Sequence, residues 1–298
     1  MADHNDAART RRAFAALTLM VVIWGINFPI AKAALGELTP LAFNALRFPL
    51  AAAVVYLALR RYGPIPWPDP LDRRRVILLG VLGNALYQQF FIFGLAHSRA
   101  GIASVLLAGT PIVTALLSAS AGHERVRLRA WTGVLTGFAG IALVIAAGGR
   151  TEGADGSVAG NLVMLGACLA WAVYTVGSRD LVARYGPIPV TAWTLWAGTL
   201  VIVTIGLPAL ARTNLGALPV AAWGGVIYAG MLSIGVAYLI WYQGVRQLGN
   251  TRTAAFSNLV PIVALTAAWI GLAERPAPLQ LLGAAIVIGG VTLTQSRG

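Results

Sequence analysis

The 298-residue chain is poor in charge and almost free of cysteine. Only 11% of its residues are charged, whereas a soluble protein of ordinary composition carries about a quarter. Cys168 is the single cysteine, which excludes a disulfide within the chain and makes a cysteine-based metal site unexpected. There is no HExxH pattern, and no serine of an apolar segment has a histidine beside it in the sequence. These absences argue against an enzyme, and we expect no metal and no cofactor.

Apolar residues take the place of the missing charges. They make up 58% of the chain, and the mean hydropathy is +0.75. They fall in long blocks, and a block of about 20 apolar residues matches the roughly 30 Å hydrocarbon core of a bilayer. We therefore expect an all-α integral membrane protein with ten transmembrane helices and no sizeable soluble domain. The expected segments are 13–34, 40–59, 76–97, 101–121, 130–148, 158–178, 188–210, 219–244, 253–272 and 278–295.

The net charge of +12 comes from arginines that gather in alternate connections between these segments. Residues 72–75 read DRRR, and residues 123–129 read HERVRLR. Because basic residues concentrate in cytoplasmic loops, this distribution predicts that both termini lie in the cytoplasm. It also explains the positive charge without a nucleic-acid partner. We expect a multi-pass protein of the bacterial cytoplasmic (inner) membrane.

The stretch IWGINFPIAK, residues 23–32, has a counterpart in the second half of the chain, and later landmarks recur in the same way. The pattern predicts two five-helix repeats, residues 1–149 and 150–298. Five is an odd number, so the repeats must be inverted relative to each other, a construction typical of secondary transporters with a central substrate cavity between the halves. The matched pairs are Trp24 with Trp171 and Lys32 with Arg179, 147 residues apart, and Pro111 with Pro261, Glu124 with Glu274, Gly133 with Gly283 and Gly140 with Gly290, 150 residues apart.

The residues that recur also carry a family resemblance. WGINFPIAK in the first segment, the prolines of GTPI and LVPI, the glutamates of HER and AER and the glycine-rich closing segments resemble the EamA-type drug/metabolite transporter superfamily. The resemblance covers nearly the whole chain, once in each half. It implies a ten-helix carrier of small metabolites, most like the bacterial exporters of aromatic and other neutral amino acids.

Polar side chains within the expected spans need partners in protein or in a water-filled cavity. Asn27 lies one helical turn after Trp24, and Asn84, Tyr87 and Gln88 share one helix face. We interpret such residues as lining the substrate cavity; the alternative is hydrogen bonding and packing between helices. The expected cavity residues are Trp24, Asn27, Asn84, Tyr87, Gln88, Thr110, Trp171, Tyr174, Tyr238, Tyr242, Ser257 and Asn258.

Two further features bear on mechanism. Pro111 and Pro261 occupy matching positions and are either hinges for alternating access or fixed kinks. Arg47 is the lone charge in the interior of an expected span, since Lys32 ends its own helix. It could contact a substrate carboxylate, snorkel to the membrane surface or cap helix carbonyls.

Charges and glycines at the ends of the spans have simpler interpretations. Lys32 and Arg179 are expected to stabilise the ends of their own helices, and Glu124 and Glu274 to stabilise the starts of the fifth and tenth helices. Small-residue faces, Gly133 with Gly137 and Ala285 with Gly289, predict close helix contacts and could serve a homodimer.

Together these features predict a secondary transporter that exports small neutral metabolites, above all aromatic and other neutral amino acids, by alternating access. No acid lies within the expected spans, and the histidines, His4, His97 and His123, lie at the N-terminus or at connections, which favours facilitated transport over proton coupling. The alternative is a proton-coupled efflux transporter for lipophilic drugs. The expected partners are the small-molecule substrate and the lipid bilayer.

Overall fold

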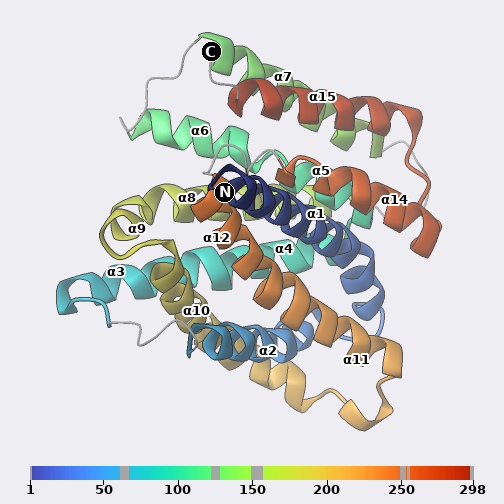
Figure 1. The fold of residues 1–298 in the computed structure, drawn as a ribbon. Helices are drawn as coiled ribbons and strands as arrows, with labels where there is room; N and C mark the ends of the chain where they lie inside the picture. The colour runs from blue at the N-terminus through green and yellow to red at the C-terminus, as the bar shows by residue number, and fades with distance from the viewer. Residues whose placement is uncertain are drawn as a thin grey trace.

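A computed structural model describes residues 2–60, 67–121, 128–148, 157–248, 253 and 256–295. Throughout this part of the chain the structure is helical, with no β-strand (Figure 1). The helices are α1 (Ala2–Ala34), α2 (Pro40–Arg60), α3 (Pro70–Gly80), α4 (Tyr87–Ala96), α5 (Ala100–Leu107), α6 (Thr110–Ser120), α7 (Leu128–Gly148), α8 (Val158–Gly177), α9 (Arg179–Tyr185), α10 (Pro187–Ala211), α11 (Val220–Ile227), α12 (Ala237–Leu248), α14 (Val260–Leu272) and α15 (Pro278–Gln295).

Ten apolar helical stretches correspond to the ten expected segments. Seven are long and apolar enough to cross a membrane, and three described stretches are shorter, Trp131–Ala147, Val260–Leu272 and Pro278–Leu293. The third stretch begins at Pro70 rather than at residue 76, so Asp72 lies in the first turn of a helix and not in a connection. Proline at the first position explains this start, because its missing N–H is not needed there. The seven longer stretches are Arg11–Ala34, Pro40–Arg60, Pro70–Ala96, Ala100–Ser120, Val158–Gly177, Pro187–Ala211 and Val220–Leu248.

The helices pack in pairs that recur between the two halves of the chain. α1 packs against α12 and α14 of the C-terminal half, and α8 packs against α4, α5 and α6 of the N-terminal half. α10 lies along α2, and α7 lies along α15. In Figure 1 the α7–α15 pair lies at one edge of the molecule, above α5 and α14. Most of the interior therefore consists of contacts between the halves.

Two kinds of helix irregularity occur at matching positions in the two halves. π-Helical segments, Val81–Leu86 and Tyr228–Val236, interrupt the third and eighth stretches, and they end 150 residues apart. The fourth and ninth stretches are each divided by a turn, after which Thr110 and Val260 begin new helices. Pro111 and Pro261 thus lie in the first turn of a new helix rather than inside a continuous kinked helix. π-Helical turns are frequent at functional sites.

Glycines allow α7 and α15 to approach closely. A Cβ at Gly290 would lie 2.5 Å from the backbone nitrogen of Gly137, and one at Gly140 would lie 2.8 Å from that of Val287. The expected contact of Ala285 and Gly289 with another helix of the same chain is wrong, because a Cβ at Gly289 meets nothing within 4 Å. Gly283 and Gly290 of α15 make the contact with α7 instead.

Candidate functional site

Arg47 lies at the centre of a buried polar cluster between α2 and α4. Its side chain is only 1% exposed. Nε donates a 2.9 Å hydrogen bond to Oδ1 of Asn44, one turn earlier on α2, and Nη2 donates a 2.7 Å bond to Oε1 of Gln88 on α4. The Nδ2 group of Asn44 donates in turn to the backbone oxygen of Gln88 and to Oε1 of Gln89, both at 3.2 Å. Amide groups therefore hold a fully desolvated cation.

Three aromatic rings complete the surroundings of the guanidinium. Its central carbon lies 4.9 Å from the ring centre of Phe43, 5.6 Å from that of Phe48 and 5.7 Å from that of Phe91. Among the described residues no carboxylate pairs with Arg47. A charge at the centre of a membrane helix costs about 2.5–3.5 kcal/mol on insertion scales, and intramembrane charges usually mark functional sites. The snorkelling interpretation of Arg47 is wrong, because the side chain is enclosed by protein.

Tyr87, Trp171 and Tyr174 form an aromatic row between α4 and α8. The ring centres of Tyr87 and Trp171 are 4.9 Å apart, and those of Trp171 and Tyr174 are 5.2 Å apart. The hydroxyl of Tyr174 lies 3.1 Å from that of Thr194 on α10. The ring planes are tilted by 48° and 43° to each other, and such an aromatic wall with a hydroxyl at its end can accept an apolar ring and the polar group attached to it.

Trp24 and Tyr238 form a second aromatic group, where α1 meets α12. Their rings meet edge to face at 6.3 Å, and Trp241 lies 5.7 Å from Trp24. Nε1 of Trp24 donates a 2.9 Å hydrogen bond to the backbone oxygen of Ser233 in the π-helical segment Tyr228–Val236. Trp24 and Trp171, which correspond in the sequence, thus each pack on an aromatic residue of the opposite half.

Other expected cavity residues have local or packing roles. The hydroxyl of Thr110 donates to the backbone oxygen of Leu107, and Asn84 is buried where its Cβ faces Gly198 of α10. Tyr242 accepts a short hydrogen bond from Thr191. Ser257 and Asn258 lie at the turn that precedes α14.

Asn27 and Gln89 each have one buried polar atom that makes no hydrogen bond in the described part of the chain. These atoms are Oδ1 of Asn27 and Nε2 of Gln89. Buried polar atoms are nearly always paired, so such exceptions call for an explanation. Sequence reasoning named Asn27 but missed Gln89, as well as Asn44 and Thr194. The spacing of Asn44 and Arg47, three residues apart on one helix, was the available signal.

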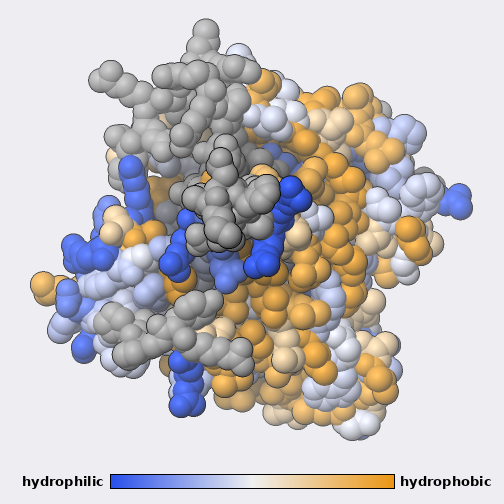
Figure 2. Space-filling model, viewed as in Figure 1, coloured by the Kyte–Doolittle hydropathy of each residue, from blue (hydrophilic) through white to orange (hydrophobic). Residues whose placement is uncertain are grey.

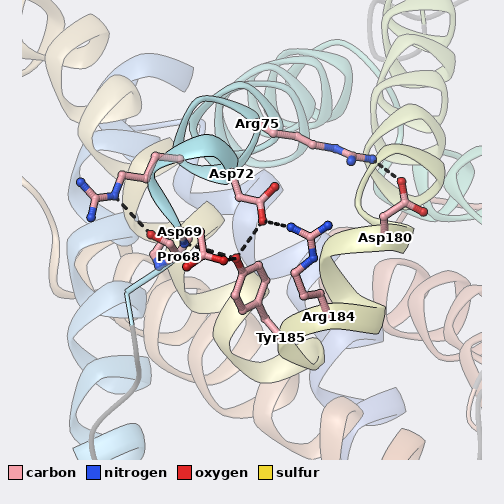
Figure 3. A network of polar contacts seen from close by, with 8 residues as sticks. Pro68, Asp69, Asp72, Arg75, Asp180, Arg184 and Tyr185 are labelled. Carbon is pink, nitrogen blue, oxygen red and sulfur yellow. Dashed lines mark hydrogen bonds and ion pairs between the residues drawn. The ribbon is translucent and has the colours of Figure 1, made fainter.

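A polar network ties the two halves at one end of the bundle, which we call the Asp72 end (Figure 3). Arg184 of α9 is paired with Asp72 of α3, and the hydroxyl of Tyr185 donates to Asp72 Oδ2 at 2.7 Å. Nearby, Arg75 pairs with Asp180 at 2.9 Å. The hydrogen bond with Tyr185 and the charge of Asp72 raise the pKa of Arg184 above its ordinary value, so Arg184 stays charged.

The opposite end of the bundle, the Glu274 end, is also held by polar contacts. The carboxylate of Glu274 accepts from the backbone N–H groups of Ala100 (2.9 Å) and Gly101 (3.2 Å), at the start of α5. Nζ of Lys32 donates to the last carbonyls of α4, those of Leu95 and Ala96. The expected role of Glu274 is therefore corrected, because it stabilises the start of a helix other than the one it precedes. Lys32 lies in the last turn of α1, as expected, and also bonds the end of α4. Glu124 lies outside the described residues.

The surface agrees with a bilayer environment. In Figure 2 hydrophobic residues cover a broad area of the visible face, and hydrophilic residues gather toward one side of it. Leu200 and Ile270 are 71% and 80% exposed. Such a broad exposed apolar surface is rare on soluble monomers and marks contact with a membrane or with another protein. No group of His, Cys, Asp or Glu that could hold a metal occurs among the described residues.

The fold and surface define a polytopic helical membrane protein. The sequence model of the EamA-like transporter family matches residues 12–146 and again residues 158–295. The chain belongs to this transporter family. It is 31% identical to the "Probable terminal-alkyne amino-acid exporter" of Streptantibioticus cattleyicolor, over 96% of this chain and 94% of the exporter.

Other similar proteins agree with this assignment. The chain is 30% identical to the "Uncharacterized transporter YdfC" of Bacillus subtilis, over 93% of this chain and 89% of the relative. A solved crystal structure aligns with a TM-score of 0.66, covering 95% of this chain and 97% of that one. At 21% identity this likeness concerns the fold alone.

Proposed function

We propose that the protein exports small neutral metabolites, above all aromatic and other neutral amino acids, by alternating access. The observation that carries the proposal is the set of aromatic, amide and guanidinium side chains that α1, α2, α4, α8 and α12 bring into the interior. Aromatic rings offer surfaces to an apolar side chain, and the amides and hydroxyls offer hydrogen bonds to a polar backbone. The name of the Streptantibioticus exporter, an amino-acid exporter, supports this substrate class.

The proposed architecture is ten transmembrane helices in two inverted repeats, residues 1–149 and 150–298. Three observations support it: the family match falls once in each half, the π-helical segments and helix breaks recur at an offset of 150, and the helix contacts are exchanged symmetrically between halves. Inverted repeats place the substrate site near the membrane midplane and allow one repeat to rock against the other.

Alternating access requires that contacts between the halves break at one end at a time. The Asp72 end joins α3 to α9, and the Glu274 end joins α5 to the connection before α15, so each end carries polar ties between the halves. The arginine distribution supports an orientation in which the Asp72 end faces the cytoplasm and the Glu274 end faces outward. We propose that these ties are the inner and outer closures, in the bacterial cytoplasmic membrane. Pro111 and Pro261, beside the helix breaks, are the proposed hinges.

Transport of labelled phenylalanine into proteoliposomes loaded with unlabelled phenylalanine tests the proposal. We expect uptake in exchange for internal substrate, with no dependence on an imposed pH gradient. Trp171→Ala should lower uptake about tenfold, the effect of losing about 1.4 kcal/mol of aromatic contact. Trp269→Ala is the matched control, because Trp269 is 57% exposed on the outer face of α14.

Two results would overturn the proposal. Absence of exchange for every neutral amino acid would remove the substrate class. Uptake of lipophilic cations driven by a pH gradient would instead support proton-coupled drug efflux.

A further inference from the structure

We infer that Arg47 and Gln89 form a receptor for the carboxylate group of the transported substrate. The inference rests on the proposed function and specifies its substrate: a molecule that presents a carboxylate to α2 and α4 and an apolar group to the aromatic row of Tyr87 and Trp171.

The first argument is the unused hydrogen-bonding capacity of Arg47. A guanidinium has five N–H groups in a planar fork that matches the two oxygens of a carboxylate. Nε and Nη2 donate to the amide oxygens of Asn44 and Gln88. Nη1 has no hydrogen-bond acceptor among the residues that the structure describes, although the side chain is 1% exposed. One side of the fork is therefore held in place, and the other side is available.

The second argument is independent and comes from Gln89. Its Oε1 accepts from Nδ2 of Asn44 at 3.2 Å, which fixes the amide and makes Nε2 its remaining donor. Nε2 is buried and has no partner in the described part of the chain. Asn44 thus links two groups with unsatisfied N–H donors, Arg47 and Gln89. Unsatisfied donors gathered at one place call for an acceptor-rich ligand, and a carboxylate has acceptors only.

The third argument is charge. The acids in the described part of the chain lie toward the ends of the bundle, and Asp72, Asp180 and Glu274 have the partners given above. The surroundings of Arg47 are amides and the rings of Phe43, Phe48 and Phe91, which stabilise a cation without neutralising it. A buried charge of this kind is most favourable when a counter-charge enters the site, and a substrate carboxylate supplies it.

The aromatic row of Tyr87 and Trp171 defines what surrounds the group attached to the carboxylate. Tyr87 lies on the helix turn beside Gln88 and Gln89, and its ring contacts both Phe91 and Trp171. A carboxylate on Arg47 would therefore place an attached aromatic or aliphatic group against Tyr87. Discrimination should depend on the charge of the carboxyl group, because an amide of the same shape offers one acceptor oxygen and brings no negative charge.

Ligand-induced shifts in the melting temperature of the purified full-length protein test this receptor directly. Two probe pairs differ only in the carboxyl group: phenylalanine with phenylalaninamide, and 3-phenylpropanoate with 3-phenylpropanamide. For the wild-type protein we expect each carboxylate to give half-maximal stabilisation at a concentration about tenfold lower than its amide. Arg47→Gln should bring the ratio to about one, and Gln89→Leu should reduce it severalfold.

Several controls keep the outcome decisive. Gln89→Leu leaves the buried charge and its two amide bonds in place, so it reports on the receptor even where Arg47→Gln does not fold. Arg47→Lys keeps the charge but not the fork, and should give an intermediate preference. A wild-type protein that binds acid and amide equally, or variants that keep the full preference, would overturn the inference.

Failure of the inference can be separated from failure of the proposed function. Exchange of phenylalanine and phenylalaninamide at equal rates would support the transporter but overturn the carboxylate receptor. Stabilisation by carboxylates, lost in Arg47→Gln, without any amino-acid transport would support the receptor and overturn the proposed substrates.

Discussion

The indole N–H of Trp24, on α1, donates a 2.9 Å hydrogen bond to the backbone oxygen of Ser233, 209 residues later in the chain. The bond joins the first helix to a π-helical segment, where the backbone departs from the regular i to i−4 pattern. Trp24 is half-buried and also contacts Tyr238 and Trp241. The indole therefore makes apolar contacts and also donates a hydrogen bond to a buried carbonyl. These two roles explain why a tryptophan occupies this position in an otherwise apolar run.

Replacing Trp24 with phenylalanine should separate these two contributions. Trp24→Phe keeps an aromatic face but loses the donor, and should lower the free energy of unfolding by about 0.5–1.5 kcal/mol. Trp24→Ala also loses the ring and should cost about 3–5 kcal/mol. Thermal unfolding in detergent measures both. Equal stability of Trp24→Phe and wild type would show that the bond to Ser233 contributes nothing.

The helical segments could be predicted from the sequence because each is a long apolar run bounded by proline, glycine or charge. The partners of Arg47 could be predicted only in part. Asn44 lies on the same helix at a spacing that brings side chains together, whereas Gln88 reaches Arg47 only through the packing of α4 on α2. The π-helical segments have no sequence signal of their own, since their mixture of apolar residues, glycines and a few polar residues also occurs in regular helices.

Glu274 shows the same limit for charges at helix ends. The local sequence places it before α15, and the expectation followed from that proximity. The structure instead brings the carboxylate to the N-terminus of α5. Both interpretations rest on the same favourable interaction between an acid and a helix N-terminus. Only the tertiary packing decides which helix receives it.

The bond between Glu274 and α5 predicts a loss of stability when the charge is removed. Glu274→Ala leaves the N–H groups of Ala100 and Gly101 without their acceptor and should cost about 1 kcal/mol, as for loss of a helix cap. Glu274→Gln keeps one acceptor oxygen and should cost less. Glu37→Ala is the control, because Glu37 is exposed in the connection after α1. Melting temperatures that fall equally for Glu274→Ala and Glu37→Ala would contradict this role.

The network at the Asp72 end predicts unequal effects of two similar substitutions. Asp72→Asn removes a charge whose side chain is 13% exposed and which binds both Arg184 and Tyr185. Asp180→Asn breaks the pair with Arg75, in which both side chains are largely exposed, at 64% and 44%. Exposed ion pairs contribute little to stability. We expect the melting temperature to fall by about 2–4 °C for Asp72→Asn and to stay near the wild-type value for Asp180→Asn.

The same substitutions also examine the proposed inner closure. If the network holds the Asp72 end shut, Asp72→Asn should raise the rate at which a cysteine-specific reagent labels Leu79→Cys, since Leu79 is buried on α3, seven residues after Asp72, in contact with the apolar cluster that includes Leu181 of α9. The comparison uses Cys168→Ser as the background, and the Asp180→Asn variant as its control. Unchanged labelling in Asp72→Asn would show that the network does not control access from this end.

The contact between α7 and α15 predicts opposite results at two adjacent glycines. Gly290→Ala would place a methyl group 2.5 Å from the backbone nitrogen of Gly137 and 2.7 Å from the oxygen of Gly133, so the two helices must separate. Overpacking of this kind costs about 1–3 kcal/mol. Gly289→Ala meets nothing within 4 Å, and the higher helix propensity of alanine should leave stability equal or slightly greater. Each variant adds one methyl group to α15. A difference between their melting temperatures therefore reports the effect of crowding between α7 and α15. A Gly290→Ala protein as stable as Gly289→Ala would mean that α7 and α15 do not pack through these glycines.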